Sequence, residues 1–581
     1  MRKIAPICSA VAVASLLLVN SLCGPVDAAD ADFILYGGKI VTVDSDFSIE
    51  QAIAVGGNRI LAVGSNNDVL RLKTDKTETI DLAGKMVLPG LIDSHVHPCS
   101  ASMTEFDHVI DDMDSITNVL AYFKSRAEAL EDGQWIVLEQ VFITRLREQR
   151  YPTRTELDGA APKNPAVFRT GPDASLNTLA LKLSGIDKDL QITDGGPGYI
   201  EKDPNTGEPT GILRGCNRLI QSKESDKEPT EQERYDRLLA LFKSYNSVGI
   251  TGICDGSASD SNLRLYSRML EQGDLPVRVS AQYYIDTIGP IEQIQQSIRK
   301  VAEDPLCKGG PKIRIIGVKT FLDGGMLTGS AYMTKPWGLS KIYAIDDPEY
   351  RGMLFIPKDR LLPMVKTATE CGLQFTSHTV GDGAVETLLD VYEELSTTMP
   401  IRQMRHCITH SNFMSRRDVD RLARLKVIAL AQPAWLYLDA RTLVQHFGYD
   451  RLRWFQPWRS IFEADGIVAG GSDHMQKIGA LRAINPYNPF LAMWTAITRQ
   501  AKWYDGRLHP QEALDREQVI RMYTINCAYA LFQDEICGSL EAGKLADFIV
   551  VDTDLLTCPV DAIRNTTVLR TYFDGRLVFK H

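Results

Sequence analysis

The sequence has few cysteines, and they lack the spacing of a disulfide framework or of a zinc site built from thiolates. Of its 11 cysteines, Cys8 and Cys23 precede residue 29, which leaves nine (11 minus 2) scattered along the rest of the chain. No two of the nine form a CxxC pair, and their number is odd. A disulfide framework and a zinc–thiolate site are therefore both disfavoured, although one oxidised pair of cysteines remains an alternative.

The chain also lacks runs of basic residues. It carries 64 Lys and Arg against 74 Asp and Glu in 581 residues, a net charge of −10. Mild acidity without a basic patch argues against a nucleic-acid partner and against a polybasic membrane surface, and favours a small-molecule substrate. The length calls for a large barrel with additions or for several domains.

Long apolar runs are missing beyond the N-terminus, so we expect no membrane span once a leader is removed. At the N-terminus, Arg2 and Lys3 precede an apolar run at 10–19 and small residues at 26–28. This order is typical of a secretory signal peptide, here residues 1–28, and the run is short for an anchor helix. We expect an exported protein, periplasmic or secreted.

Both ends of the mature chain have the sequence pattern of short strands separated by turns. Residues 32–86 contain FILY, KIVTV and AIAV, and residues 535–581 contain DFIVVD and RLVF. Neither segment is long enough to bury a sheet of its own well. We therefore predict one small β-sandwich built from both chain ends.

Residues 87–534 alternate strand-like runs with helical stretches, which predicts an α/β fold with a parallel sheet. The expected strands number eight, the number that closes a (β/α)8 TIM barrel. Their ranges are 87–92, 249–254, 277–284, 313–321, 373–378, 406–410, 427–432 and 467–473. The first two are too far apart for a simple crossover, so residues 100–245 are expected to be an inserted cap after strand 1.

Polar residues gather where these strands run into their following loops, which is where barrel enzymes place their chemistry. The residues in question are His95, His97, Lys319, His378, His410 and Asp473. On a strand, residues i and i+2 share a face, so His95 and His97 would project together toward one divalent metal.

Each of these residues also has an ordinary explanation when taken alone. HxH is a short pattern, and two polar residues at a strand end can be incidental. Lys319 could form a buried ion pair with Asp323, and Asp473 could cap a helix. Six such residues at strand ends together favour a functional site.

Several sequence motifs resemble those of a known family. They are LPGLIDSHVH at 88–97, VKTFLDG at 318–324, HTVGDGAV at 378–385, GSD at 471–473 and GSLEAGKLADF at 538–548. With these words the chain resembles the amidohydrolase superfamily, and within it the YtcJ-like branch of metal-dependent hydrolases that includes N-substituted formamide deformylases.

The resemblance implies a centre of one or two divalent metal ions, most often zinc. His95, His97 and Asp473 would hold one ion, and His378 and His410 the other. It further implies that Lys319, carboxylated by carbon dioxide to a carbamate, bridges the ions. Asp473 would take a proton from the attacking water and pass it to the leaving amine.

Three positions outside the ligand set are expected to contact substrate: Asp173, Asp323 and His474. Asp173 stands in GPDASLN, where relatives often have His, and His474 directly follows Asp473. A further departure is Thr409, which precedes His410 where many relatives have Glu. Specificity is therefore expected to differ from that of the deformylases.

The leading hypothesis from the sequence is an exported metal-dependent hydrolase of an amide or cyclic amide C–N bond. One alternative is an isomerase or decarboxylase that uses the same centre. Another is an exported binding or regulatory protein without catalysis, because a fold does not fix a function. The sequence leaves the number of subunits open, with a homodimer among the alternatives.

Overall fold

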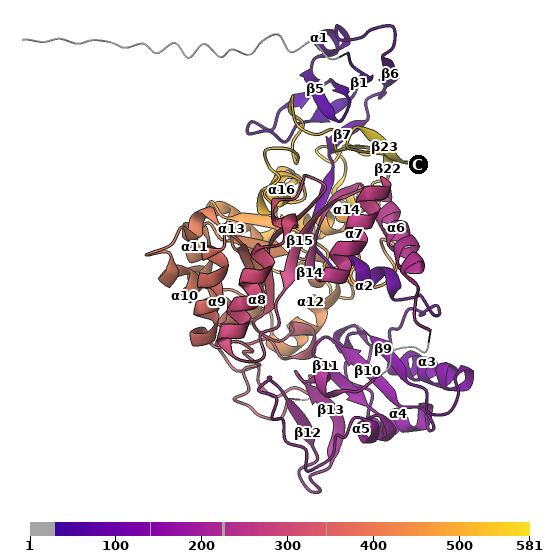
Figure 1. The fold of residues 1–581 in the computed structure, drawn as a ribbon, viewed down its shortest axis with the longest axis vertical. Helices are drawn as coiled ribbons and strands as arrows, with labels where there is room; N and C mark the ends of the chain where they lie inside the picture. Colours follow the sequence, from indigo (N-terminus) through magenta and orange to yellow (C-terminus); the bar gives the residue numbers. More distant parts are fainter. Residues whose placement is uncertain (1–29, 140, 223–226, 344) are drawn as a thin grey trace, which may run out of the picture.

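The computed structural model describes residues 30–139, 141–222, 227–343 and 345–581. It has three parts along its long axis, with the terminal sheets at one end, a barrel in the middle and the inserted segment at the other end (Figure 1). The expected signal peptide, residues 1–28, lies outside the described residues. Within the described part of the chain, no helix combines the length and the apolar character needed to cross a bilayer.

The middle part is an eight-stranded sheet in which all neighbouring strands are parallel. Its strands are β8 (Leu91–Val96), β14 (Ile250–Ala258), β15 (Arg278–Tyr284), β16 (Ile313–Phe321), β17 (Gln374–Thr379), β18 (Cys407–His410), β19 (Ile428–Ala431) and β20 (Ile467–Gly470). The first and last strands meet where the Asp473 amide donates to the His95 carbonyl at 2.8 Å. The predicted (β/α)8 barrel is confirmed.

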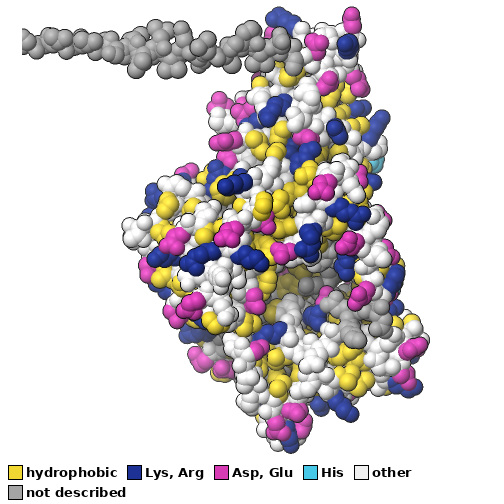
Figure 2. Space-filling view, viewed as in Figure 1, with side chains coloured by type: hydrophobic (Ala, Val, Ile, Leu, Met, Phe, Trp, Pro, Cys, Tyr) yellow, Lys and Arg dark blue, Asp and Glu magenta, His cyan; other side chains and the backbone are white. Residues whose placement is uncertain are grey.

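Helices between the strands form the outer layer of the barrel. Those used below are α2 (Pro98–Met103), α6 (Glu231–Ser247), α9 (Lys358–Glu370), α10 (Asp382–Leu395), α11 (Arg416–Leu425), α12 (Pro433–Phe447), α13 (Trp458–Glu463) and α14 (Pro489–Thr498). Over the face drawn in Figure 2, acidic and basic side chains are interspersed without a patch of one sign. This distribution agrees with the mild net charge of the sequence.

The two chain ends together form two small sheets, one from N-terminal strands alone and one that joins strands from both ends. One sheet has the order β5-β4-β1-β6 and the other the order β23-β22-β21-β7-β2-β3. The sheets pack face to face, with Phe33 of β1 (Phe33–Tyr36) stacked on Tyr572 of β22 (Val568–Phe573) at 5.2 Å between ring centroids. Neither end could bury these apolar faces without the other.

The apolar run at 87–92, predicted to be one barrel strand, is divided between two sheets. Its first half belongs to β7 (Met86–Pro89) of the terminal sandwich, and its second half begins β8 of the barrel. Gly90 lies between them against Thr251, whose Oγ1 a Cβ at Gly90 would meet at 2.1 Å. Both strands are buried, so an unbroken apolar run gives no sign of the change of sheet.

The inserted segment folds into a five-stranded sheet with its own core. The strands are β9 (Ile136–Glu139), β10 (Ala166–Thr170), β11 (Asp173–Leu176), β12 (Tyr199–Lys202) and β13 (Pro209–Arg214), in the order β12-β13-β11-β10-β9. Helices α3 (Ile116–Ala129), α4 (Arg154–Ala160) and α5 (Thr178–Leu183) lie beside this sheet (Figure 1). We call this segment, up to residue 222, the cap.

The predicted C-terminal limit of the cap, residue 245, is too late. Helix α6 begins at a capping box formed by Thr230 and Glu233, and its apolar residues recur at helical spacing. Its buried face, which includes Leu238 and Phe242, packs against the barrel and not against the cap sheet. Because α6 leads into β14, it is the crossover helix of the barrel.

The cysteines in the described part of the chain are all free. Cys254, Cys407, Cys527 and Cys537 are buried in one apolar cluster. They pack there as small hydrophobic side chains.

Candidate metal centre

His95, His97 and Asp473 form a compact group where the first and last barrel strands meet. His95 lies on β8, His97 directly follows this strand, and Asp473 follows β20. Asp473 Oδ1 is 3.5 Å from His95 Nε2 and 3.3 Å from His97 Nε2. One ligand atom from each of the three residues lies within 4.8 Å of the others. This spacing suits a single cation bound between them.

Two more histidines extend the group across the barrel mouth. The centroids of the His378 and His410 rings are 4.6 Å apart, and those of His95 and His410 are 5.3 Å apart. His97 is 5.0 Å from His95 by the same measure. The four imidazoles therefore form one continuous cluster at the carboxyl ends of β8, β17 and β18.

Lys319 is buried on β16 next to this cluster. Burial lowers the pKa of its amine to about 8, against the opposing attraction of Asp473. Burial also holds the pKa of His95 and of His410 well below the usual value, and the charge of Lys319 adds to this effect. Both imidazoles are therefore neutral at pH 7, the form in which histidine binds a metal.

Residues behind the histidines orient the rings. His410 Nδ1 is 2.8 Å from Gln432 Oε1, so Nδ1 carries the proton and Nε2 keeps its lone pair. The ring also stacks on Trp435 at 4.5 Å between centroids. On the other side, His378 Nδ1 is 3.4 Å from Asp323 Oδ1.

Two members of the cluster hold unusual backbone angles. His410 has a φ of 82° and Asp473 a φ of 55°, both in the left-handed region. Such angles are uncommon for residues other than glycine and collect at functional sites. Two hydrogen bonds hold the backbone of Asp473. Its amide donates to the His95 carbonyl, and Asn485 Nδ2 donates to the Asp473 carbonyl at 2.7 Å.

The donor set fits a divalent metal ion. It consists of four imidazoles, one carboxylate and one amine, all at one end of the barrel. His95 Nδ1 is buried without a hydrogen-bond partner among the described residues, and so is His378 Nδ1. Nitrogen-rich sites of this kind prefer zinc over magnesium or calcium.

The structure does not place the three predicted substrate-binding residues at an open surface. The Asp323 carboxylate accepts from the backbone amides of Tyr332, Val380 and Gly381 at 2.9–3.0 Å. With these bonds it holds the loop behind His378. Asp323 is therefore a positioning group, because its side chain is fully buried.

The structure does not bring His474 to the barrel mouth, where a substrate contact was predicted. Its Nδ1 is 2.7 Å from the Tyr245 hydroxyl, and its Nε2 lies 2.9 and 2.8 Å from the carbonyls of Gln476 and Lys477. Both ring nitrogens are used inside the protein, and the residue is fully buried. The backbone turns at Asp473, which sends the next side chain away from the barrel mouth.

The structure does not bring Asp173 to the barrel mouth either, because its carboxylate is fully buried in the cap. It accepts from the Gly215 amide at 2.7 Å and pairs with Arg214 at 3.2 Å. Arg214 in turn donates to the carbonyls of Thr328 and Tyr343 in the loop after β16. The Asp173–Arg214 pair thus holds the cap against a barrel loop.

We expect Asp173→Ala to lower the free energy of unfolding by about 3–5 kcal/mol, because it leaves the Arg214 charge buried and unpaired. Urea unfolding followed by fluorescence measures the change. The control is Asp194→Ala, which breaks a partly exposed pair with Arg218 and should cost about 0–1 kcal/mol. Equal losses in the two variants would contradict the role given to Asp173.

Sequence reasoning missed Gly256, which gives the His95 ring its space. A Cβ at this position would meet His95 Cε1 at 2.1 Å and Nδ1 at 2.2 Å. Gly256 lies on β14, beside β8, and the only signal in the sequence is a glycine within a strand. Gln432 and Asn485 were also missed, because isolated amides have no motif.

We expect Gly256→Ala to displace the His95 ring and to weaken zinc binding about 10–100-fold, the usual effect of disturbing a group behind a ligand. Competition with a chromophoric chelator measures the affinity. Gly159→Ala is the control, since nothing lies within 4 Å of a Cβ there. Unchanged zinc affinity in the Gly256 variant would show that His95 is not a ligand.

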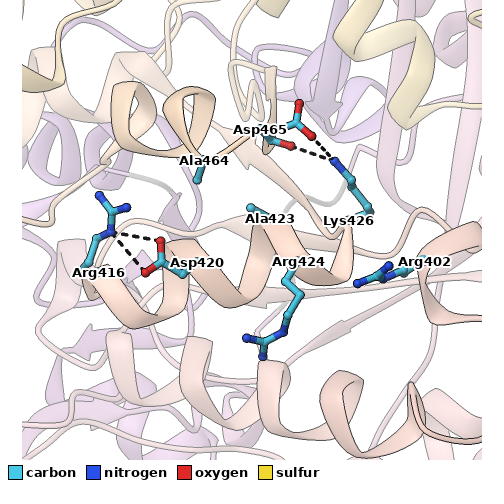
Figure 3. Close-up of a pocket in the computed structure, with 8 residues that line it drawn as sticks. All are labelled: Arg402, Arg416, Asp420, Ala423, Arg424, Lys426, Ala464 and Asp465. Atoms are coloured by element: carbon cyan, nitrogen blue, oxygen red, sulfur yellow. Dashed lines mark hydrogen bonds and ion pairs between the residues drawn. The ribbon is translucent and has the colours of Figure 1, made fainter.

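A surface groove over α11 is a separate feature (Figure 3). It is lined by that helix and by the turns that lead into the amino ends of β18, β19 and β20. Two ion pairs lie along it, Arg416 with Asp420 at 3.1 Å and Lys426 with Asp465 at 2.5 Å. The histidine cluster lies at the carboxyl ends of the strands, so this groove is not part of the candidate centre.

Comparison with known proteins agrees with the barrel fold. The chain is 29% identical over 570 residues to an N-substituted formamide deformylase from Arthrobacter pascens, covering 94% of this chain and 98% of the relative. It is 26% identical over 592 residues to Protein LONG AFTER FAR-RED 3 of Arabidopsis thaliana, covering 98% and 96%.

Among solved structures, an uncharacterized metal-dependent hydrolase from Pyrococcus horikoshii superposes with a TM-score of 0.65 at 22% identity. The match covers 91% of this chain and 99% of that one, and it supports the fold. The sequence profile of the Amidohydrolase family matches residues 78–579. This match takes in the barrel, the cap and the terminal sandwich from β6 (Glu78–Asp81) onward, and the chain belongs to the amidohydrolase family.

Proposed function

We propose that this protein is an exported, metal-dependent hydrolase that cleaves the C–N bond of an amide or a cyclic amide. The observation that carries the proposal is the convergence of four imidazoles, a carboxylate and an amine at the carboxyl ends of five barrel strands. Membership of the amidohydrolase family supports it, and so does the likeness to a relative named for N-substituted formamides.

The donor atoms divide into two groups. His95, His97 and Asp473 would hold one divalent ion, most readily zinc, and His378 and His410 would hold a second. When bound, the ions would polarise the substrate carbonyl and lower the pKa of the attacking water. The neutral imidazole of His410 is already oriented for this by Gln432.

Lys319 would join the two groups as a carbamate. Its amine nitrogen would form a bond to the carbon of carbon dioxide and release a proton, which leaves an anionic carboxyl group on the side chain. Lys319 is 1% exposed and lies among the histidines. An anionic oxygen ligand at this position would complement cations held between the histidines.

Asp473 would carry the proton. Its carboxylate faces His95 and His97, and its backbone is fixed by the hydrogen bonds described above. It would accept a proton from the attacking water and donate it to the leaving nitrogen, which departs as an amine. The side chain keeps its charge at the start and end of each cycle.

The substrate would approach from the side of His97 and His378, the two partly exposed members of the cluster, whose side chains are 20% and 14% accessible. Phe321 lies beside this approach, since its ring is 5.4 Å from that of His378. Phe321 is also 36% exposed. An apolar group on the substrate would pack against it.

The test is metal analysis of the purified protein followed by a screen of formamides, N-acyl amines and lactams in water enriched in oxygen-18. We expect bound zinc and a product that has gained one labelled oxygen. A product without label would support the isomerase or decarboxylase alternative. Absence of metal and of turnover would support the binding protein instead.

Export and the number of subunits are separate parts of the proposal. Residues 1–28 support a periplasmic or secreted location, which fractionation of cells with and without this segment tests. Sedimentation of the mature chain distinguishes a monomer from a homodimer. Retention of the full-length chain in the cytoplasm would reject export.

A further inference from the structure

The segment between Asp473 and α14 is fastened to the cap. Gln476 Nε2 donates to the Glu139 carbonyl at 2.7 Å, and Lys477 Nζ is 3.1 Å from Asp112 Oδ1. Near the end of the segment, Asn485 is fully buried and donates to the Asp473 carbonyl at 2.7 Å. Asp473, which carries the carboxylate of the candidate centre, is therefore held by a residue of the segment that follows it.

Arg145 of the cap holds Asn485 in turn. Its Nη1 donates to Asn485 Oδ1 at 3.0 Å and to the Ile484 carbonyl at 2.7 Å. The other edge of the guanidinium donates to both carboxylate oxygens of Asp439 on α12, at 3.2 and 2.9 Å. Thr144 Oγ1 also donates to Asp439 Oδ1 at 2.8 Å.

This chain of bonds is buried along its length. The Arg145 side chain is 11% exposed and that of Asp439 is 0% exposed. A planar guanidinium bound on two edges has little freedom to move. The amide group of Asn485 is therefore fixed in direction, with its oxygen toward Arg145 and its nitrogen toward the Asp473 carbonyl.

Asp473 needs such a restraint. Its φ of 55° is a backbone conformation that costs free energy for an L residue and persists only where the surroundings impose it. If the carbonyl of Asp473 were released, the backbone would relax toward an ordinary angle. The carboxylate would then move relative to His95 and His97.

We propose that Arg145 is a positioning residue of the catalytic centre, acting through Asn485 to fix the backbone of Asp473. The inserted cap thereby completes the barrel site in addition to covering it. This inference rests on the proposed function for its catalytic consequence, whereas its structural consequence can be measured without a substrate.

Two variants break the connection at different points. Asn485→Asp keeps an acceptor for Arg145 and removes the donor to the Asp473 carbonyl. Arg145→Gln removes the guanidinium, and the paired change Arg145→Gln with Asp439→Asn avoids a buried unpaired carboxylate if the single variant fails to fold. The control is Glu105→Gln, which loosens Arg482 of the same segment from the cap but does not reach Asn485.

The first readout is hydrogen exchange of the Asp473 amide, which is bonded to the His95 carbonyl. We expect it to exchange at least about tenfold faster in the Arg145 and Asn485 variants than in the wild type or in Glu105→Gln. The second readout is kinetic. We expect kcat to fall about 10–100-fold with KM changed less than about twofold, as for other groups that orient a catalytic residue.

The outcomes separate this inference from the proposed function. Faster exchange with no amide hydrolysis in the wild type would support the positioning role and reject the hydrolase. Unchanged exchange and unchanged kcat in folded variants would overturn the positioning role. Effects that simply add in the double variant of Arg145 and Asn485 would also overturn it, because two residues that act through one another must show coupling.

Discussion

Replacing Asp473 by Asn is expected to lower kcat by about 10²–10⁴-fold, the range that one general acid–base group contributes. The amide has the shape of the carboxylate but cannot accept and return a proton. The backbone bonds of residue 473 do not involve the side chain, so the fold should be kept. Steady-state kinetics with a substrate from the amide screen measures the effect.

The Asp473 variant requires a control for loss of one negative charge. Asp420→Asn serves, since Asp420 lies on the outer surface of α11 in an exposed pair with Arg416. It should leave kcat within about twofold of the wild type, because exposed pairs contribute little. Activity retained by Asp473→Asn would reject its assignment as the proton carrier.

The second large effect is expected from Lys319→Ala, which should lose both bound zinc and turnover. The amine lies on β16 beside the histidine cluster, and its removal takes away the proposed bridging ligand. A short carboxylic acid such as propionate should restore part of the activity, because it can supply an anionic oxygen to the space left by the side chain.

Lys319→Gln is the matched variant, since it fills the space but offers neither a carbamate nor room for the added acid. It should stay inactive when propionate is present. Metal content measured with and without the acid connects rescue to binding. Full zinc occupancy in Lys319→Ala, without rescue, would count against the carbamate bridge.

The arrangement of the barrel could be read from the sequence to a large extent. The strand-like runs recur with helical stretches between them, and the carboxyl ends of parallel strands must meet at one edge of the sheet. From this rule alone, the six candidate residues between His95 and Asp473 could be predicted to lie close together. The passage of the chain from one sheet to another between β7 and β8 could not be predicted, because the sequence of a buried strand is the same in a sandwich and in a barrel.

The roles of the residues around the ligands were less accessible. Asp173 and His474 were expected at the substrate because of their neighbours in sequence, yet both side chains turn to partners inside the protein, Arg214 and Tyr245. The direction of a side chain after a strand depends on the local backbone angle. At Asp473 that angle is left-handed, and no residue pattern in GSDH indicates it.

The sequence by itself determined the strand periodicity, the apolar chain ends that must share a sheet, and the histidine, lysine and aspartate side chains at strand ends. These follow from local spacing, because side-chain alternation and strand direction are properties of short segments. Only the tertiary structure decided that Gly256 makes room for His95 and that Arg145 reaches Asp473 through Asn485. Gly256 is far from His95 in the sequence, and Arg145 is 340 positions from Asn485. A pairing between such residues is set by how the whole chain packs.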